Sequence, residues 1–90
     1  MHAVVIQVTI QDFERGRQTL EERIVPTVKQ APGFVTGYWT RSEDDRGMGL
    51  VVVESEENAR GLADMIRSAP PDDGVTLESI DVREVVAHAG

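Results

Sequence analysis

The side chains best suited to holding a small ligand are Gln7, Trp39 and Arg41. Trp39 is the only tryptophan, and its indole could stack on a planar ligand while Arg41 polarises a developing enolate or phenolate. Gln7 could donate a hydrogen bond to a ligand carbonyl. Each also has a purely structural alternative, because Trp39 could pack at an interface or edge strand and Gln7 could be a hydrogen-bonded residue of a sheet. We take Gln7, Trp39 and Arg41 as candidate ligand-binding residues.

Other reactive residues give no recognisable site. His2 and His88 are the only histidines; neighbouring terminal strands could bring them together, but a third metal ligand is missing, so no metal is expected. The serines have no histidine–acid pattern, and Gly47-Met48-Gly49 enters a strand with no lysine after it, unlike a phosphate loop. With no cysteine, disulfides and thiolate metal sites are excluded. The residues therefore identify no catalytic group and no cofactor.

Composition limits the partners. The 90 residues are 40% hydrophobic and 28% charged, as in an ordinary globular chain, and we expect a single domain over residues 1–90. The net charge of −7 argues against nucleic acid and anionic membranes. There is no apolar run of about 18 residues and no signal-peptide pattern at the amino terminus, so a cytoplasmic protein is expected.

The first half of the chain predicts a strand and a helix. Residues 2–10 alternate with period two and are rich in β-branched side chains, which is typical of a strand. After Asp12, a predicted N-cap, apolar residues recur at helical spacing as far as Ala31. Pro26 should kink this helix without breaking it, and Pro32-Gly33 should end it.

The second half predicts a hairpin, a helix and a last strand. Residues 34–41 and 48–54 read as strands joined by a polar loop that ends in glycine. Ser55 is a predicted N-cap for a helix with its apolar stripe at Ala59, Leu62, Ala63 and Ile66. Pro70-Pro71 should end this helix, residues 72–74 should reverse the chain, and residues 75–88 should form the last strand before a frayed end.

The resulting order, βαββαβ, predicts an α+β, ferredoxin-like fold with an antiparallel sheet and both helices on one face. The first and third strands are apolar on both faces, and we expect one face to hold Val4, Ile6, Met48, Leu50 and Val52, and the other Val5, Val51 and Val53. Whichever face is left bare also takes apolar residues from the other two strands. The strand at residues 34–41 adds either Phe34 and Tyr38 or Val35 and Trp39. The strand at residues 75–88 adds either Leu77 and Val85 or Ile80, Val82 and Val86.

Two helices cannot cover both faces of such a sheet. Burying roughly seven large apolar side chains on the bare face, at about 1.5–3 kcal/mol each, would contribute on the order of 10 kcal/mol. That is comparable with the net stability of a whole domain. We therefore expect a closed homodimer in which two bare faces stack.

Three segments, in order and spacing, resemble the antibiotic-biosynthesis-monooxygenase domains of the dimeric α+β barrel superfamily. They are residues 31–38 (APGFVTGY), the acidic loop 42–45 (SEDD) and the helix start 53–59 (VESEENA). The resemblance implies a small homodimer with a pocket between sheet and helices; some members oxidise aromatic polyketides without metal or flavin, and others degrade haem. Val53 stands where members commonly have tryptophan, the nearest polar residue to the expected first-strand asparagine is Gln7, and no histidine occurs in residues 55–69.

We expect a dimeric barrel that binds a small apolar or aromatic molecule, with oxygen insertion into an electron-rich substrate as the reaction that the resemblance implies. The alternatives are a non-catalytic dimeric binding or scaffold protein, and an accessory domain of a larger enzyme. A cavity of several hundred cubic ångströms with convergent polar groups would favour ligand binding. A core filled by Phe13, Leu62 and Ile66 would favour a scaffold.

Overall fold

The computed structural model describes residues 1–70 and 74–90. In these residues the strands β1 (His2–Ile10), β2 (Phe34–Arg41), β3 (Arg46–Val53) and β4 (Val75–Glu84) form one antiparallel sheet in the order β2-β3-β1-β4. This mixed α+β arrangement is compatible with the predicted ferredoxin-like fold. The turn predicted at Asp72 and Asp73 lies outside the described residues.

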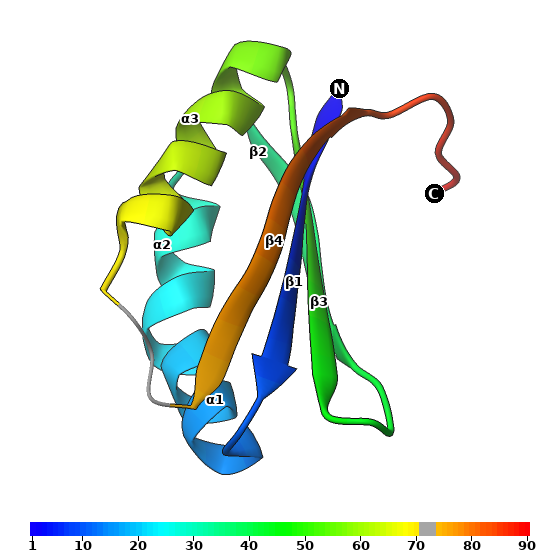
Figure 1. Cartoon of the computed structure of the whole chain (residues 1–90). Helices are drawn as coiled ribbons and strands as arrows, with labels where there is room; N and C mark the ends of the chain where they lie inside the picture. Colours follow the sequence, from blue (N-terminus) through cyan, green and yellow to red (C-terminus); the bar gives the residue numbers. More distant parts are fainter. Residues whose placement is uncertain (71–73) are drawn as a thin grey trace.

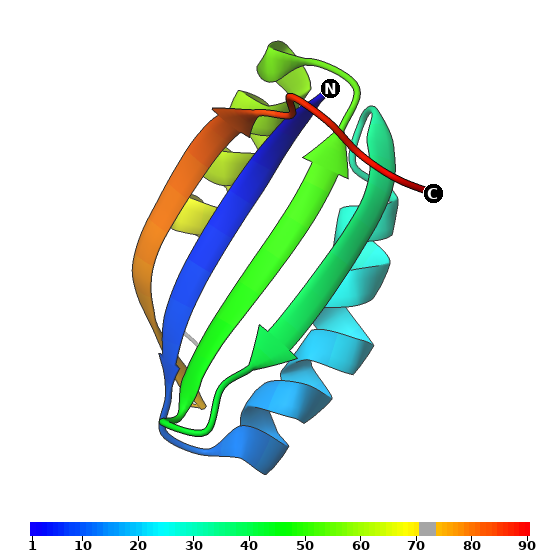
Figure 2. The ribbon, with the colours of Figure 1, turned by 90° about the vertical axis from the view of Figure 1, so that its right-hand side faces the viewer.

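All helical segments lie on one face of the sheet (Figure 1). They are α1 (Phe13–Thr19), η1 (Leu20–Ile24), α2 (Val25–Lys29) and α3 (Glu56–Ser68). Figure 2 looks onto the other face, which we call the open face, and there the strands of the described chain have no helix in front of them. The core lies between the sheet and the helices and includes Val4, Val28, Val51, Val53, Ala59, Leu62 and Ala63.

The strand register corrects our assignment of side chains to the two faces. Val4 lies opposite Val51, and Val5 lies opposite Leu50. Directly opposed residues of an antiparallel pair project to the same face. Val4 and Ile6 therefore share the helix-covered face with Val51 and Val53, whereas Met48, Leu50 and Val52 lie on the open face with Val5. The alternation within each strand was predicted, but the pairing between the two strands was wrong.

Two irregularities in the sheet also change which residues share a face. Between Phe34 and Thr36 the register of β2 on β3 shifts, and Phe34 and Trp39 both pack against the core. Between Gln7 and Val8 the register of β1 on β4 shifts, so that Leu77 and Ile80 both lie opposite helix-face residues. A β-bulge of this kind inserts one unpaired residue and reverses the alternation beyond it. Neither predicted pair for β2 is therefore correct.

The helix that follows β1 begins as predicted, and the Asp12 side chain accepts a hydrogen bond from the Arg15 N–H at 3.1 Å. Where a kink was expected, residues Leu20–Ile24 form a π-helical turn in which the Val25 N–H bonds to the Leu20 carbonyl. Pro26 has no N–H, and its ring would clash with the carbonyl four residues earlier in a regular α-helix. The wider turn accommodates the ring without ending the helix.

Strand β4 is shorter than the sequence predicted. β4 stops at Glu84 rather than His88, although the Val85 N–H still bonds to the Met1 carbonyl at 3.1 Å. The residues after Glu84 leave the sheet on its open-face side (Figures 1 and 2). Val86 in this segment is 87% exposed in the single chain.

Helix α3 has the predicted N-cap and apolar stripe. The Asn58 N–H donates to Ser55 Oγ at 3.1 Å, while Ala59, Leu62 and Ala63 are buried against the sheet.

We expect Ser55→Ala to lower the free energy of unfolding by about 1 kcal/mol, because the first turn loses the acceptor for one of its N–H groups. Urea denaturation followed by circular dichroism measures this loss. Ser68→Ala, at the exposed carboxyl end of the same helix, is the matched control. An equal loss in both variants would mean that the cap does not stabilise α3.

Candidate functional site

Trp39 lies on the helix-covered face of the sheet, opposite Gly49. Its ring extends over two glycines: a Cβ added at Gly49 would come within 2.9 Å of Trp39 Nε1, and one at Gly37 within 3.0 Å of Cη2. The indole is partly buried and packs against the core. The two glycines therefore create the space that the ring occupies, which supports the structural alternative considered for Trp39.

Arg41 follows on the same strand, near the start of α1. Its guanidinium lies 3.6 Å from the centroid of the Phe13 ring, a cation–π contact. Arg41 projects to the same face as Trp39, two residues further along β2, and its own side chain stays exposed. The arrangement places the Arg41 cation against one aromatic ring of the chain itself, that of Phe13.

Gln7 lies on the open face, where it pairs with Met48 of β3. It lines a hollow of about 130 Å³ together with Thr9, Arg46 and Glu78. Thr9 Oγ1 donates to Glu78 Oε1 at 3.1 Å, beside the bulge in β4. The structure therefore brings Trp39 and Arg41 together and places Gln7 on the other side of the sheet. Thr9, Arg46 and Glu78 were not predicted from the sequence as site residues. Glu78 could have been predicted only if the bulge in β4 had been known.

His2 lies beside the first turn of α3. Its Nε2 is 3.7 Å from Glu56 Oε1, and its Nδ1 is buried without a hydrogen-bond partner among the described residues. His88 is in the exposed segment after β4. In the described part of the chain no group of three or more histidine or acidic residues is arranged to hold a metal ion.

Glu56 is held by Arg60, whose Nη2 lies 2.8 Å from Glu56 Oε2. Hydrogen bonding and charge attraction from Arg60, with a smaller attraction from His2, lower the pKa of Glu56 below its ordinary value of 4.5. A carboxyl with a lowered pKa in the folded state stabilises the fold above its ordinary pKa. That stabilisation is lost as the pH falls through the lowered value.

The stability of Glu56→Gln is therefore expected to fall less steeply than that of the unmodified protein on acidification from about pH 5 to pH 3. Urea midpoints at several pH values provide the measurement, and Glu57→Gln is the neighbouring control. Because Glu56 is exposed, the difference should be small. Parallel pH profiles for the unmodified chain and the Glu56 variant would contradict the assignment.

The centre of the open face is apolar. Its side chains are Val5, Tyr38, Met48, Leu50 and Val52. Val5 is only 7% exposed, whereas Tyr38 is 64% and Met48 42% exposed. On β4 the same face carries Asp81 and Arg83, so the patch is narrower than the seven-residue surface we expected. We call Val5, Tyr38, Met48, Leu50 and Val52 the open-face patch.

A cavity of about 340 Å³ lies between α3 and the outer edge of β4. Gln7, Trp39 and Arg41 are not among its lining residues. Of the residues expected to fill a scaffold core, Leu62 is 3% exposed and Ile66 packs against the core, while Phe13 lies beneath Arg41. Leu62 and Ile66 thus belong to the packed core, and the cavity of about 340 Å³ lies away from the candidate residues Gln7, Trp39 and Arg41.

No family model matches the chain, and no curated protein is similar in sequence. In the described residues no helix is both long and apolar enough to cross a membrane.

Proposed function

We propose that the chain is one subunit of a homodimeric α+β barrel that binds a small apolar or aromatic molecule. The observation that carries this proposal is the open-face patch, because no helix of the described chain covers it. Monomeric proteins rarely expose large contiguous apolar patches, and the open-face patch runs along the middle of the sheet across β1, β2 and β3. A second copy presents a surface of the same kind, so two open faces can bury each other around a two-fold axis.

The size of the open face suits such an interface. Four strands of about eight residues cover roughly 26 by 19 Å at normal strand spacing and rise, or about 500 Å² before side-chain relief is counted. A standard stable interface buries about 800 Å² of accessible surface on each partner. Two stacked sheets therefore reach the usual range if side-chain relief and the rims together add about 300 Å² on each partner.

The polar groups at the two sides of the open face are complementary. On this face β4 carries the acceptors Asp81 and Glu78, the latter bonded to Thr9, while β2 carries the hydroxyls of Thr36 and Tyr38; the Thr40 hydroxyl already donates to the Met48 carbonyl at 3.1 Å. A two-fold axis parallel to the strands places β4 of one copy over β2 of the other. Hydroxyl donors then face carboxylate acceptors at both rims.

Within each subunit, we propose that a ligand contacts Arg41 and the exposed part of the Trp39 ring, whose other side packs against the core, because the two combine an aromatic surface with a cation on the helix-covered face. Oxygen insertion into an aromatic substrate is the second candidate function, and the adjacency of Arg41 to Trp39 favours it, because a cation there could stabilise a developing phenolate.

Sedimentation velocity of the unmodified chain at several micromolar concentrations tests the dimer. We expect a dimer that dissociates only on dilution; a monomer throughout would refute the proposal. Titration with dihydroxyanthrone, followed by the fluorescence of Trp39 and an oxygen electrode, tests the ligand. Quenching of the Trp39 fluorescence without oxygen uptake would support ligand binding and refute the oxygenase function.

A further inference from the structure

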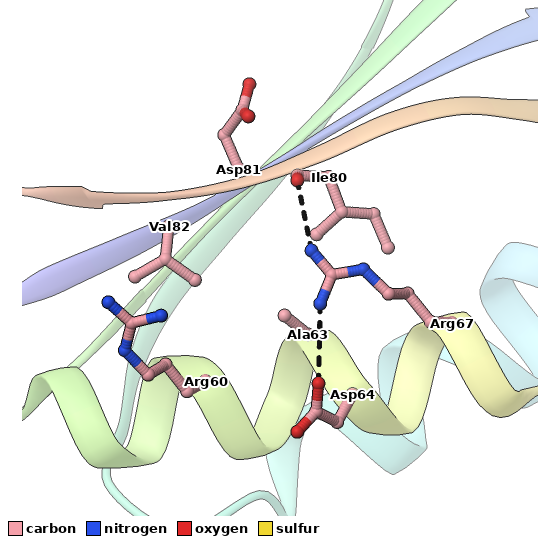
Figure 3. A pocket seen from close by; sticks show the side chains of 7 residues that line it. All are labelled: Arg60, Ala63, Asp64, Arg67, Ile80, Asp81 and Val82. Atoms are coloured by element: carbon pink, nitrogen blue, oxygen red, sulfur yellow. Dashed lines mark hydrogen bonds and ion pairs between the residues drawn. The ribbon is translucent and has the colours of Figure 1, made fainter.

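The groove between α3 and the outer edge of β4 combines an apolar floor with basic side chains at both ends (Figure 3). Ala63 is fully buried, so the partly buried side chains of Ile80 and Val82, which pack against the core, form a small apolar floor. Arg60 and Arg67 extend from the helix toward the strand. The volume of about 340 Å³ is within the range of small-molecule sites.

The guanidinium groups are held in place without being saturated. Arg67 donates from Nη2 to the Ile80 carbonyl and from Nη1 to Asp64 Oδ1, both at 3.3 Å. Arg60 donates from Nε to Glu56 Oε2 at 2.9 Å. A guanidinium carries five N–H donors in a planar fork that matches a carboxylate. Both arginines therefore keep donors for a ligand.

Each arginine is paired with an acid of α3, Glu56 with Arg60 and Asp64 with Arg67, so the positions of the carboxylates that line the groove decide which charge borders it. The carboxylate of Asp81 points away from α3, and that of Asp64 lies on the side of Arg67 away from the strand (Figure 3). The space between helix and strand is thus bordered by guanidinium groups above hydrocarbon. Such a space favours a ligand that has an apolar body and negative charge.

The spacing of the arginines narrows the class of ligand. Arg60 and Arg67 are seven residues apart on α3, which separates their positions by roughly 10 Å along the helix axis. We propose that the groove binds an extended dicarboxylate with a hydrocarbon body, one carboxylate on each arginine and the body over Ile80 and Val82. This site lies on the helix side of the sheet and does not depend on the proposed dimer.

Nonanedioate tests the proposal with the full chain, and octanoate serves as a ligand with a single carboxylate. Binding is followed by amide and arginine Nε–Hε chemical shifts in ¹H–¹⁵N spectra. We expect nonanedioate to bind at least fivefold more tightly than octanoate, with the largest shifts at Arg60, Arg67 and β4. Arg60→Gln and Arg67→Gln should each reduce the affinity for nonanedioate to that for octanoate.

Arg17→Gln is the matched control, because Arg17 is likewise held by nearby acids, Glu14 of α1 and Glu21 of η1, but lies on α1. It should leave the affinity unchanged. The exposed positions of Arg60 and Arg67 allow both variants to fold, and amide spectra without ligand verify this. Absence of binding, equal affinity for the two ligands, or binding that survives both substitutions would each overturn the proposal.

Discussion

Replacing Met48 with aspartate is expected to make the protein monomeric at micromolar concentration, whereas the same replacement at Met65 leaves it dimeric. The two methionines are nearly equally exposed in the single chain, at 42% and 43%. Met48 lies on the open face in β3, and Met65 lies on α3 on the helix side. In a two-fold symmetric interface the Met48→Asp substitution occurs once in each copy, so dimer formation would bury two unpaired carboxylates.

We expect the dissociation constant of Met48→Asp to rise by at least about 100-fold, which corresponds to about 2.8 kcal/mol. Sedimentation velocity measures this change, and circular dichroism establishes that both variants remain folded. Tyr38→Asp, at an even more exposed position of the open-face patch, is a second variant. An unchanged dissociation constant in both open-face variants would show that the sheet face is not the interface.

The second prediction with a large expected effect concerns Gly49, which lies against the Trp39 ring. Gly49→Ala is expected to lower the free energy of unfolding by about 1–3 kcal/mol, because the added Cβ would overlap the indole and force the ring to move. The close approach of 2.9 Å to both Cδ1 and Nε1 means that the whole five-membered ring must shift. Since Trp39 is the only tryptophan, its fluorescence emission should shift to longer wavelength as the ring becomes more exposed.

Gly61→Ala provides the matched control, because a Cβ at Gly61 on α3 meets no atom within 4 Å. There alanine should stabilise the helix by up to about 1 kcal/mol, since it has a higher helix propensity than glycine. Opposite signs for the two substitutions in urea denaturation are the expected result. Equal stability of Gly49→Ala and the unmodified protein, with unchanged emission, would contradict the placement of Trp39 over Gly49.

The elements themselves could be predicted from local signals. β1 and β2 have the predicted boundaries, and the side chains of Asp12 and Ser55 cap helices as expected. These features depend on neighbouring residues only: alternation, helical spacing and the N-cap preference of short polar side chains. The boundary of β4 was less predictable, because Val85 and Val86 continue the β-branched pattern after the sheet has ended.

The faces of the sheet could not be predicted, because they depend on register and on bulges. A shift of one residue in the pairing of β1 with β3 changes which side chains of the two strands share a face. No residue within either strand determines this register. The bulges near Phe34 and Glu78 then reverse the alternation within β2 and β4. For the same reason, Gln7 seemed compatible with the site of Trp39 and Arg41, although the sheet separates them.

The most direct test of the stacked open faces is an isotope-filtered NOE experiment on dimers that combine a ¹³C-labelled and an unlabelled copy. It detects only contacts between subunits. We predict signals from the methyl groups of Leu50 and Val52 to the partner chain, with further signals involving the Tyr38 ring. Inter-subunit signals confined to α1 or α3, or a filtered spectrum without signals from the open-face patch, would contradict the account.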